Sequence, residues 1–200
     1  MKLAHSFLPA LAVGALLVAG CGTNSSADDS QSAALGNPVD RAFVAAMIPH
    51  HQSAVQMAKI AQRRGQSAFV KQLADDIVRT QTKEIATMRA ADQRLQRAGI
   101  KKGALGVPKH MMGMNGDVSM LKTAKSFDRA FLRMMIPHHQ VAVVMAKAEL
   151  KKGKDPELKR LAQNIITAQQ REIRQMRRHL SHAGTTGMPQ GSMHGDGHSG

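Results

Sequence analysis

The chain has 200 residues, enough for one domain with a hydrophobic core, and a formal net charge of +14 at pH 7. A balance this basic is typical of nucleic-acid-binding proteins. However, the chain contains no Trp or Tyr for base stacking, and it begins with an export signal, so we expect no nucleic-acid partner. The single cysteine excludes an internal disulfide and a thiolate metal cluster.

Residues 1–21 have the anatomy of a secretory signal peptide. An apolar run over residues 7–19 ends in Val18-Ala19-Gly20-Cys21, which resembles the lipobox of bacterial lipoproteins. We therefore expect cleavage before Cys21 and a membrane anchor through lipidation of its thiol. The alternative is an uncleaved membrane helix, but the run is shorter than the roughly 20 residues that span a bilayer. Residues 22–36 are mostly small and polar and predict a flexible tether.

An internal repeat organises the rest of the chain. Met47-Ile48-Pro49-His50-His51-Gln52 recurs letter for letter, 88 positions later, as Met135-Ile136-Pro137-His138-His139-Gln140. The same offset continues without a gap as far as Met88 and Met176. The duplication predicts one domain made of two similar halves.

Each half has the pattern of an antiparallel helix hairpin. Apolar residues recur at steps of four and three, Gly65 and Gly153 mark the turns, and Asn37, Ser67 and Asp155 are suitable N-caps. Neither hairpin can bury its own apolar stripe, so the two should pack on each other as an all-α four-helix bundle. We expect the bundle over residues 37–183, with repeats 38–98 and 126–183, a linker over 99–125 and a disordered tail over 184–200.

Pro49 and Pro137 lie well inside the first helix of each half. An interior proline removes a backbone hydrogen bond and costs about 3 kcal/mol. Because both prolines directly precede a His-His pair, we expect a kink that aims these imidazoles.

Polar residues interrupt the apolar stripe at His50, Gln81 and Glu84 and at their counterparts. No Lys or Arg shares the stripe, so a cation should neutralise the buried carboxylate. In a hairpin that turns at Gly65, Met47 and His50 lie level with Gln81, and Glu84 lies about one turn away; His51 joins if the kink rotates it inward. The candidate metal ligands are Met47, His50, His51, Glu84, Met88, Met135, His138, His139, Glu172 and Met176.

The types of these side chains favour copper. Thioether and imidazole ligands together suit Cu(I), although another transition metal is possible. Ferritin-type di-iron sites need Glu-x-x-His steps, and the sequence contains none. The linker adds His110, Met111, Met112 and Met114, and the tail adds Met188, Met193, His194 and His198, which we interpret as secondary metal-capture segments.

The repeated block with Met-Ile-Pro-His-His-Gln, followed by Ile77, Gln81, Glu84 and Met88 and their copies, resembles the bacterial domain-of-unknown-function family 305. The resemblance covers about residues 38–180 and implies a ferritin-like four-helix bundle. Some family members are implicated in copper binding and copper tolerance outside the cytoplasm. The resemblance maps such a role onto Met47, His50, His51, Glu84 and Met88 and onto their counterparts in the second half.

The leading hypothesis is an exported, lipid-anchored protein that sequesters copper without catalytic turnover. It requires both His-His pairs to face inward, close to Glu84 and Glu172. Two alternatives remain open. One is a metal-dependent redox enzyme of the cell envelope, and the other is a structural or interaction module whose polar positions only set the helix register.

Overall fold

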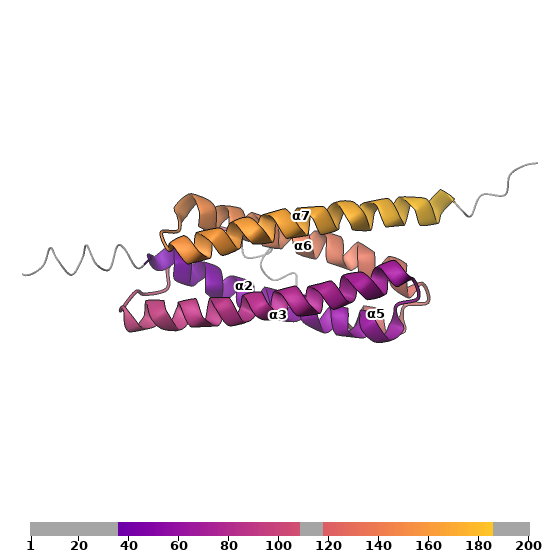
Figure 1. Cartoon of the computed structure of the whole chain (residues 1–200), viewed down its shortest axis with the longest axis horizontal. Helices are drawn as coiled ribbons and strands as arrows, with labels where there is room; N and C mark the ends of the chain where they lie inside the picture. The colour runs from indigo at the N-terminus through magenta and orange to yellow at the C-terminus, as the bar shows by residue number, and fades with distance from the viewer. Residues whose placement is uncertain (1–35, 109–117, 186–200) are drawn as a thin grey trace, which may run out of the picture.

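The computed structural model describes residues 36–108 and 118–185. Within these ranges the chain forms helices and no strand. The elements are α2 (Pro38–Arg64), α3 (Ala68–Arg97), the short α5 (Val118–Thr123), α6 (Phe127–Lys152) and α7 (Pro156–Thr185). Figure 1 shows the four long helices lying along a common axis, with α6 antiparallel to α2. The predicted all-α four-helix bundle is confirmed. The expected signal peptide, residues 22–35 of the tether and residues 186–200 of the tail lie outside the described residues.

The helices begin where side-chain caps are available. Asn37 Oδ1 accepts hydrogen bonds from the backbone N–H groups of Val39 at 2.8 Å and Asp40 at 3.2 Å. Ser67 Oγ accepts from Val70 N at 3.2 Å. Asp155 Oδ1 accepts from two N–H groups in the first turn of α7, both at 2.9 Å. The three predicted caps are therefore confirmed, and each provides acceptors for N–H groups that have no partner within the helix.

The two hairpins are joined at both ends by an aspartate of the repeat. Asp40, in the first turn of α2, accepts hydrogen bonds from the N–H groups of Lys154 and Asp155, each at 3.0 Å. Asp128, its counterpart in α6, accepts from Gln66 N at 2.9 Å and Ser67 N at 2.8 Å. Each aspartate thus satisfies the turn of the opposite hairpin, which fixes how the halves dock.

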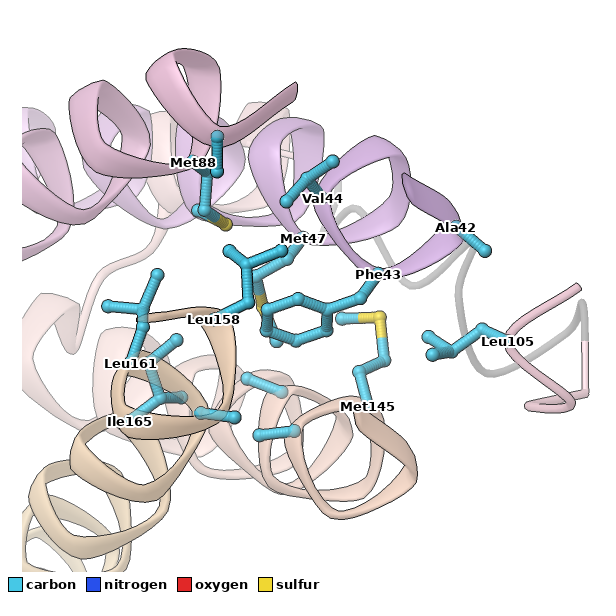
Figure 2. Packing of buried hydrophobic residues seen from close by; sticks show 14 of the residues in the cluster. Ala42, Phe43, Val44, Met47, Met88, Leu105, Met145, Leu158, Leu161 and Ile165 are labelled. Atoms are coloured by element: carbon cyan, nitrogen blue, oxygen red, sulfur yellow. The ribbon is translucent and has the colours of Figure 1, made fainter. Parts of the chain in front are cut away.

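The hydrophobic core consists of two apolar clusters, one towards each end of the bundle. The first apolar cluster contains Phe43, Met47, Met145 and Leu158, and Figure 2 shows these side chains packed together. The second apolar cluster contains Met57, Ile77, Phe131, Met135 and Met176.

Part of the expected linker packs on the bundle. Leu105 and Val107 are buried in the first apolar cluster, and Gly103 N donates a hydrogen bond to the carbonyl of Pro38 at 2.8 Å. Leu121 of α5 is buried in the second apolar cluster. The described parts of the segment between the repeats therefore add residues to both clusters.

Candidate functional site

A layer of polar side chains lies between the two apolar clusters. We call it the polar layer. All four histidines in it are buried, since His50 and His138 are 2% and 3% exposed and His51 and His139 are 0% exposed. Both His-His pairs therefore face inward, as the copper hypothesis requires. The members of the layer are His50, His51, Gln81, Glu84, His138, His139, Gln169 and Glu172.

Within each hairpin, one imidazole meets one carboxylate. His51 Nε2 lies 2.8 Å from Glu84 Oε2, and His139 Nε2 lies 2.7 Å from Glu172 Oε2. The second histidine of each pair, rather than the first, is the one that contacts the acid. α2 and α6 both continue through their interior prolines, so Pro49 and Pro137 do not end these helices.

The first histidine of each pair meets its own counterpart from the other half. The ring centroids of His50 and His138 are 3.7 Å apart and the ring planes are tilted by 33°. Contact between equivalent residues places the approximate two-fold axis of the duplicated fold between these rings. The distances within each pair are longer, 6.3 Å for His50–His51 and 6.5 Å for His138–His139. The two half-sites therefore merge into one central layer.

Many polar atoms in this layer have no hydrogen-bond partner in the protein. Buried polar atoms nearly always have partners, so a concentration of such atoms calls for an explanation. A neutral imidazole nitrogen and an amide oxygen both offer lone pairs, which are the groups that coordinate a cation. The atoms are His50 Nδ1 and Nε2, His138 Nδ1 and Nε2, His51 Nδ1, His139 Nδ1, Gln81 Oε1 and Gln169 Oε1.

The central imidazoles are neutral at physiological pH. Burial lowers the pKa of His50 to about 3, with a further contribution from the charges of His51 and His139. Burial likewise lowers the pKa of His138 to about 2, with His50 as the next cause. These side chains therefore keep a nitrogen lone pair available instead of binding a proton.

Thioethers flank the layer on both sides. The predicted ligands Met47 and Met88 are fully buried in the first apolar cluster, and Met135 and Met176 are fully buried in the second. Figure 2 shows Met47 and Met88 with Met145 in the first cluster.

The structure adds two methionines that the sequence analysis left out. Met145 of α6 joins Met47 and Met88, and its counterpart Met57 of α2 joins the other set. Each comes from the opposite hairpin, and only the repeat itself could have drawn attention to them. Gln81 and Gln169 were noticed in the stripe but were not predicted as ligands.

Among the described residues, no three His, Cys, Asp or Glu side chains form a ready-made metal-binding group. A coordination set built from this layer must therefore draw on thioethers or amide oxygens as well as imidazoles. The remaining predicted positions, Cys21 and the capture residues His110, Met111, Met112 and Met114, lie outside the described residues. None of the helices in the described ranges combines the length and hydropathy of a membrane span.

Solved structures with this fold include copper-bound proteins. CopM in the Cu(I)-bound form is 37% identical, with a TM-score of 0.61 over 72% of this chain and 96% of that one. CopM in the Cu(II)-bound form is 40% identical, with a TM-score of 0.61 over 70% and 93%. A Streptomyces coelicolor DUF305 protein described as secreted is 32% identical, with a TM-score of 0.61 over 73% and 94%.

A viral protein shares a shorter stretch. The uncharacterized protein L153 of Acanthamoeba polyphaga mimivirus is 47% identical over 49 residues, which are 24% of this chain and 32% of that protein. The match thus spans about a third of the viral relative.

The family model for the domain of unknown function DUF305 matches residues 19–92 and 40–180, which include the first repeat, nearly all of the second and the whole polar layer. A DUF305 fragment from Deinococcus radiodurans is 35% identical, with a TM-score of 0.61 over 74% of this chain and 98% of that one. The chain belongs to the DUF305 family.

Proposed function

We propose that this protein binds and sequesters copper ions outside the cytoplasm, with no catalytic turnover. The observation that carries the proposal is the set of buried imidazole nitrogens without partners in the polar layer. If this layer had no cation to bind, apolar side chains would be more stable here, because each unsatisfied buried polar group costs about 1–3 kcal/mol.

The carboxylates have a defined part in this proposal. An imidazole that donates its Nε2–H to a carboxylate keeps Nδ1 free as a ligand, and the carboxylate holds the ring in one orientation. His51 and His139 have this arrangement with Glu84 and Glu172. We therefore assign ion binding to the imidazoles and flanking thioethers, and ring orientation with charge compensation to the glutamates.

Copper is the favoured ion because of the ligand types. Neutral imidazoles and thioethers are soft or intermediate ligands, which suit Cu(I) better than hard cations. The solved CopM proteins in Cu(I)-bound, Cu(II)-bound and silver-bound forms support this choice. Silver is then a convenient closed-shell probe of the same site.

The proposed location is the outer surface of a membrane, with attachment through a lipid on Cys21. The lipobox in the sequence supports this location, and so does the secreted relative. Metabolic labelling with a fatty acid tests it: the natural chain should incorporate label and fractionate with membranes. A Cys21→Ser chain should do neither. Equal labelling of the two chains would refute the lipid anchor.

Titration with Ag(I), Cu(I) and Cu(II), on protein made without a polyhistidine tag, tests the binding site. Changing His50 and His138 together to Ala should weaken binding at least tenfold, since both central imidazoles are lost. The matched control changes His179 and His182, which lie outside the layer, and should leave affinity unchanged. Wild-type affinity in the His50/His138 variant would refute the proposal.

The linker histidine and methionines need a separate variant. Changing His110, Met111, Met112 and Met114 to Ser should lower the number of weakly bound ions and leave the tightest site intact. Loss of the tightest site in this variant would mean that this site lies outside the bundle.

A purely structural role for the polar layer makes the opposite thermal prediction. Binding to the folded state raises the melting temperature, by an amount that grows with ligand concentration. A melting temperature indifferent to copper, silver and chelator would favour a layer that only sets helix register.

A further inference from the structure

We propose that metal ions enter the polar layer from one side of the bundle, between α3 and α7, and that Glu84 and Glu172 are the first groups to hold them. This inference rests on the proposed function and assigns an entry route to the same site.

The other routes are more tightly packed. Along the bundle axis, an ion would have to cross the first or the second apolar cluster. The apolar side chains there cannot replace the water molecules that solvate the ion. Among the sides, α2 packs closely on α3, α6 on α7, and α2 on α6. The α3–α7 side has the fewest contacts of the four. A lateral path between α3 and α7 is therefore the least obstructed.

Two clefts open on this side, and each is lined by one of the two glutamates of the polar layer. The Glu84 cleft has a volume of about 660 Å³, and the Glu172 cleft has a volume of about 390 Å³. The 88-residue offset relates them, since Thr87 of the first corresponds to Gln175 of the second. The duplication has thus produced two equivalent openings.

Each glutamate connects its cleft to a buried imidazole. The Glu84 side chain is 18% exposed and the Glu172 side chain 9%, whereas the histidines they contact are 0% exposed. A hydrated cation in the cleft can exchange a water molecule for a carboxylate oxygen before it reaches the imidazole nitrogen. The stepwise exchange avoids a bare ion in an apolar environment, whose cost is large.

The two openings differ in volume and in the charged residues that line them. Arg79 and Lys83 line the Glu84 cleft. The Glu172 cleft has Arg171 at the position of Lys83 and Asp76 at the position of Asn164. Because the Glu84 cleft is the larger and Glu84 is the more exposed carboxylate, we expect most ions to enter through the Glu84 cleft.

Filling the clefts tests the route. Thr87→Phe narrows the Glu84 cleft, Gln175→Phe narrows the Glu172 cleft, and Ala90→Phe is the control at an exposed α3 position outside both. The association rate of Ag(I) is measured by stopped-flow ultraviolet absorbance in chloride-free buffer, where a chain without Trp or Tyr has little background. Circular dichroism and equilibrium titration check that folding and ion capacity are unchanged.

Thr87→Phe should slow association roughly threefold or more, Gln175→Phe less, and the double variant over tenfold, because access limits the rate. The control should bind at the wild-type rate. A double variant with intact capacity and a wild-type rate would overturn the route alone. A wild-type chain that binds no Ag(I) would overturn the proposed function and the route with it.

A charge variant gives a second test without added bulk. Asn164→Asp copies Asp76 into the Glu84 cleft and should raise the association rate roughly twofold at low ionic strength, with the gain lost in high salt. An unchanged rate at low salt would count against entry through this cleft.

Discussion

The two ends of the bundle are closed by equivalent aspartates, yet the surroundings of these aspartates differ. Asp40 accepts hydrogen bonds from the turn before α7, and Asp128 accepts hydrogen bonds from the turn before α3. The donors are N–H groups at equivalent positions of the two repeats. Asp40 is fully buried, whereas Asp128 is partly exposed. Among the described residues, two further acids are buried at the Asp40 end, Glu149 and Asp155, where the other end has Ala61 and Ser67.

Glu149 is a neutral carboxylic acid in the folded protein. Burial, and then Asp40, raise its pKa from 4.5 to about 9, with Asp155 adding to the shift and Lys159 opposing it. Neither carboxyl oxygen of Glu149 lies in hydrogen-bonding geometry with another group. A Cβ on Gly153 would collide with both Glu149 Oε1 and Asp40 Oδ1. The comparison shows that the repeats have kept one layer in common while the ends have diverged.

The largest expected effect comes from removing the two closing aspartates. Asp40→Ala should lower the free energy of unfolding by about 3 kcal/mol, because the part-buried N–H of Lys154 and the buried N–H of Asp155 lose their acceptor. Asp128→Ala should cost about 1–2 kcal/mol, since water can reach its partners. Urea denaturation measures both. Equal losses would mean that burial does not distinguish the two ends.

Changing Glu149 to Gln tests one of the two further acids at the Asp40 end. The folded chain keeps a proton on Glu149 that the unfolded chain releases above pH 4.5, so wild-type stability falls as pH rises from about 4.5 to 9. Glu149→Gln should remove this part of the fall and stabilise the protein at pH 8 by on the order of 2 kcal/mol.

The measurement is the free energy of unfolding at several pH values. Ala61→Gln, at the equivalent position of the other end, is the control and should not change the pH dependence. A variant at Glu149 that keeps the wild-type slope would show that this side chain is ionised in the folded state.

The middle of the bundle should respond symmetrically. His50→Ala and His138→Ala should each weaken Ag(I) binding roughly tenfold, about 1.4 kcal/mol, because their rings meet on the approximate two-fold axis. Isothermal titration measures the two affinities. A loss confined to one variant would mean that the halves hold the ion unequally.

The smallest effect concerns the first turns of α2 and α6. Asn37→Ala should cost about 1 kcal/mol, because its side chain caps two N–H groups. Ser126, the N-cap residue of α6, makes no side-chain cap hydrogen bond, so Ser126→Ala should change stability by only a few tenths of a kcal/mol. Thermal melts of the two variants compare them; a larger loss at Ser126 would contradict the cap assignment.

Much of the fold could be predicted because its signals are local. Each signal lies within a few residues of the helix end that it marks. The signals are the apolar periodicity, the glycines at the turns and the caps at Asn37, Ser67 and Asp155, and the helices begin at these caps. The predicted copper ligands in the bundle remain a proposal, although the structure brings the imidazoles together.

Local sequence signals could not predict which side chains meet between helices. The sequence analysis expected His50 level with Gln81, with Glu84 about one turn away and His51 as an addition. In the structure, His51 contacts Glu84 and His50 meets His138. The position of Asp40 in the first turn of α2 does not reveal that its side chain accepts hydrogen bonds from the turn of the opposite hairpin. The sequence analysis did not single out Glu149, which is fully buried in the structure.

The amino-acid sequence by itself determined four amphipathic helices, their duplication and a polar interruption in each stripe, because periodicity and caps act along one chain segment. Only the tertiary structure decided which imidazole faces the acid, which faces its own copy, and which of two equivalent ends encloses a protonated glutamate. The reason is physical: a helical stripe defines a face, but the partner of each side chain on that face depends on how two hairpins dock, and docking is set by contacts between residues far apart in the chain.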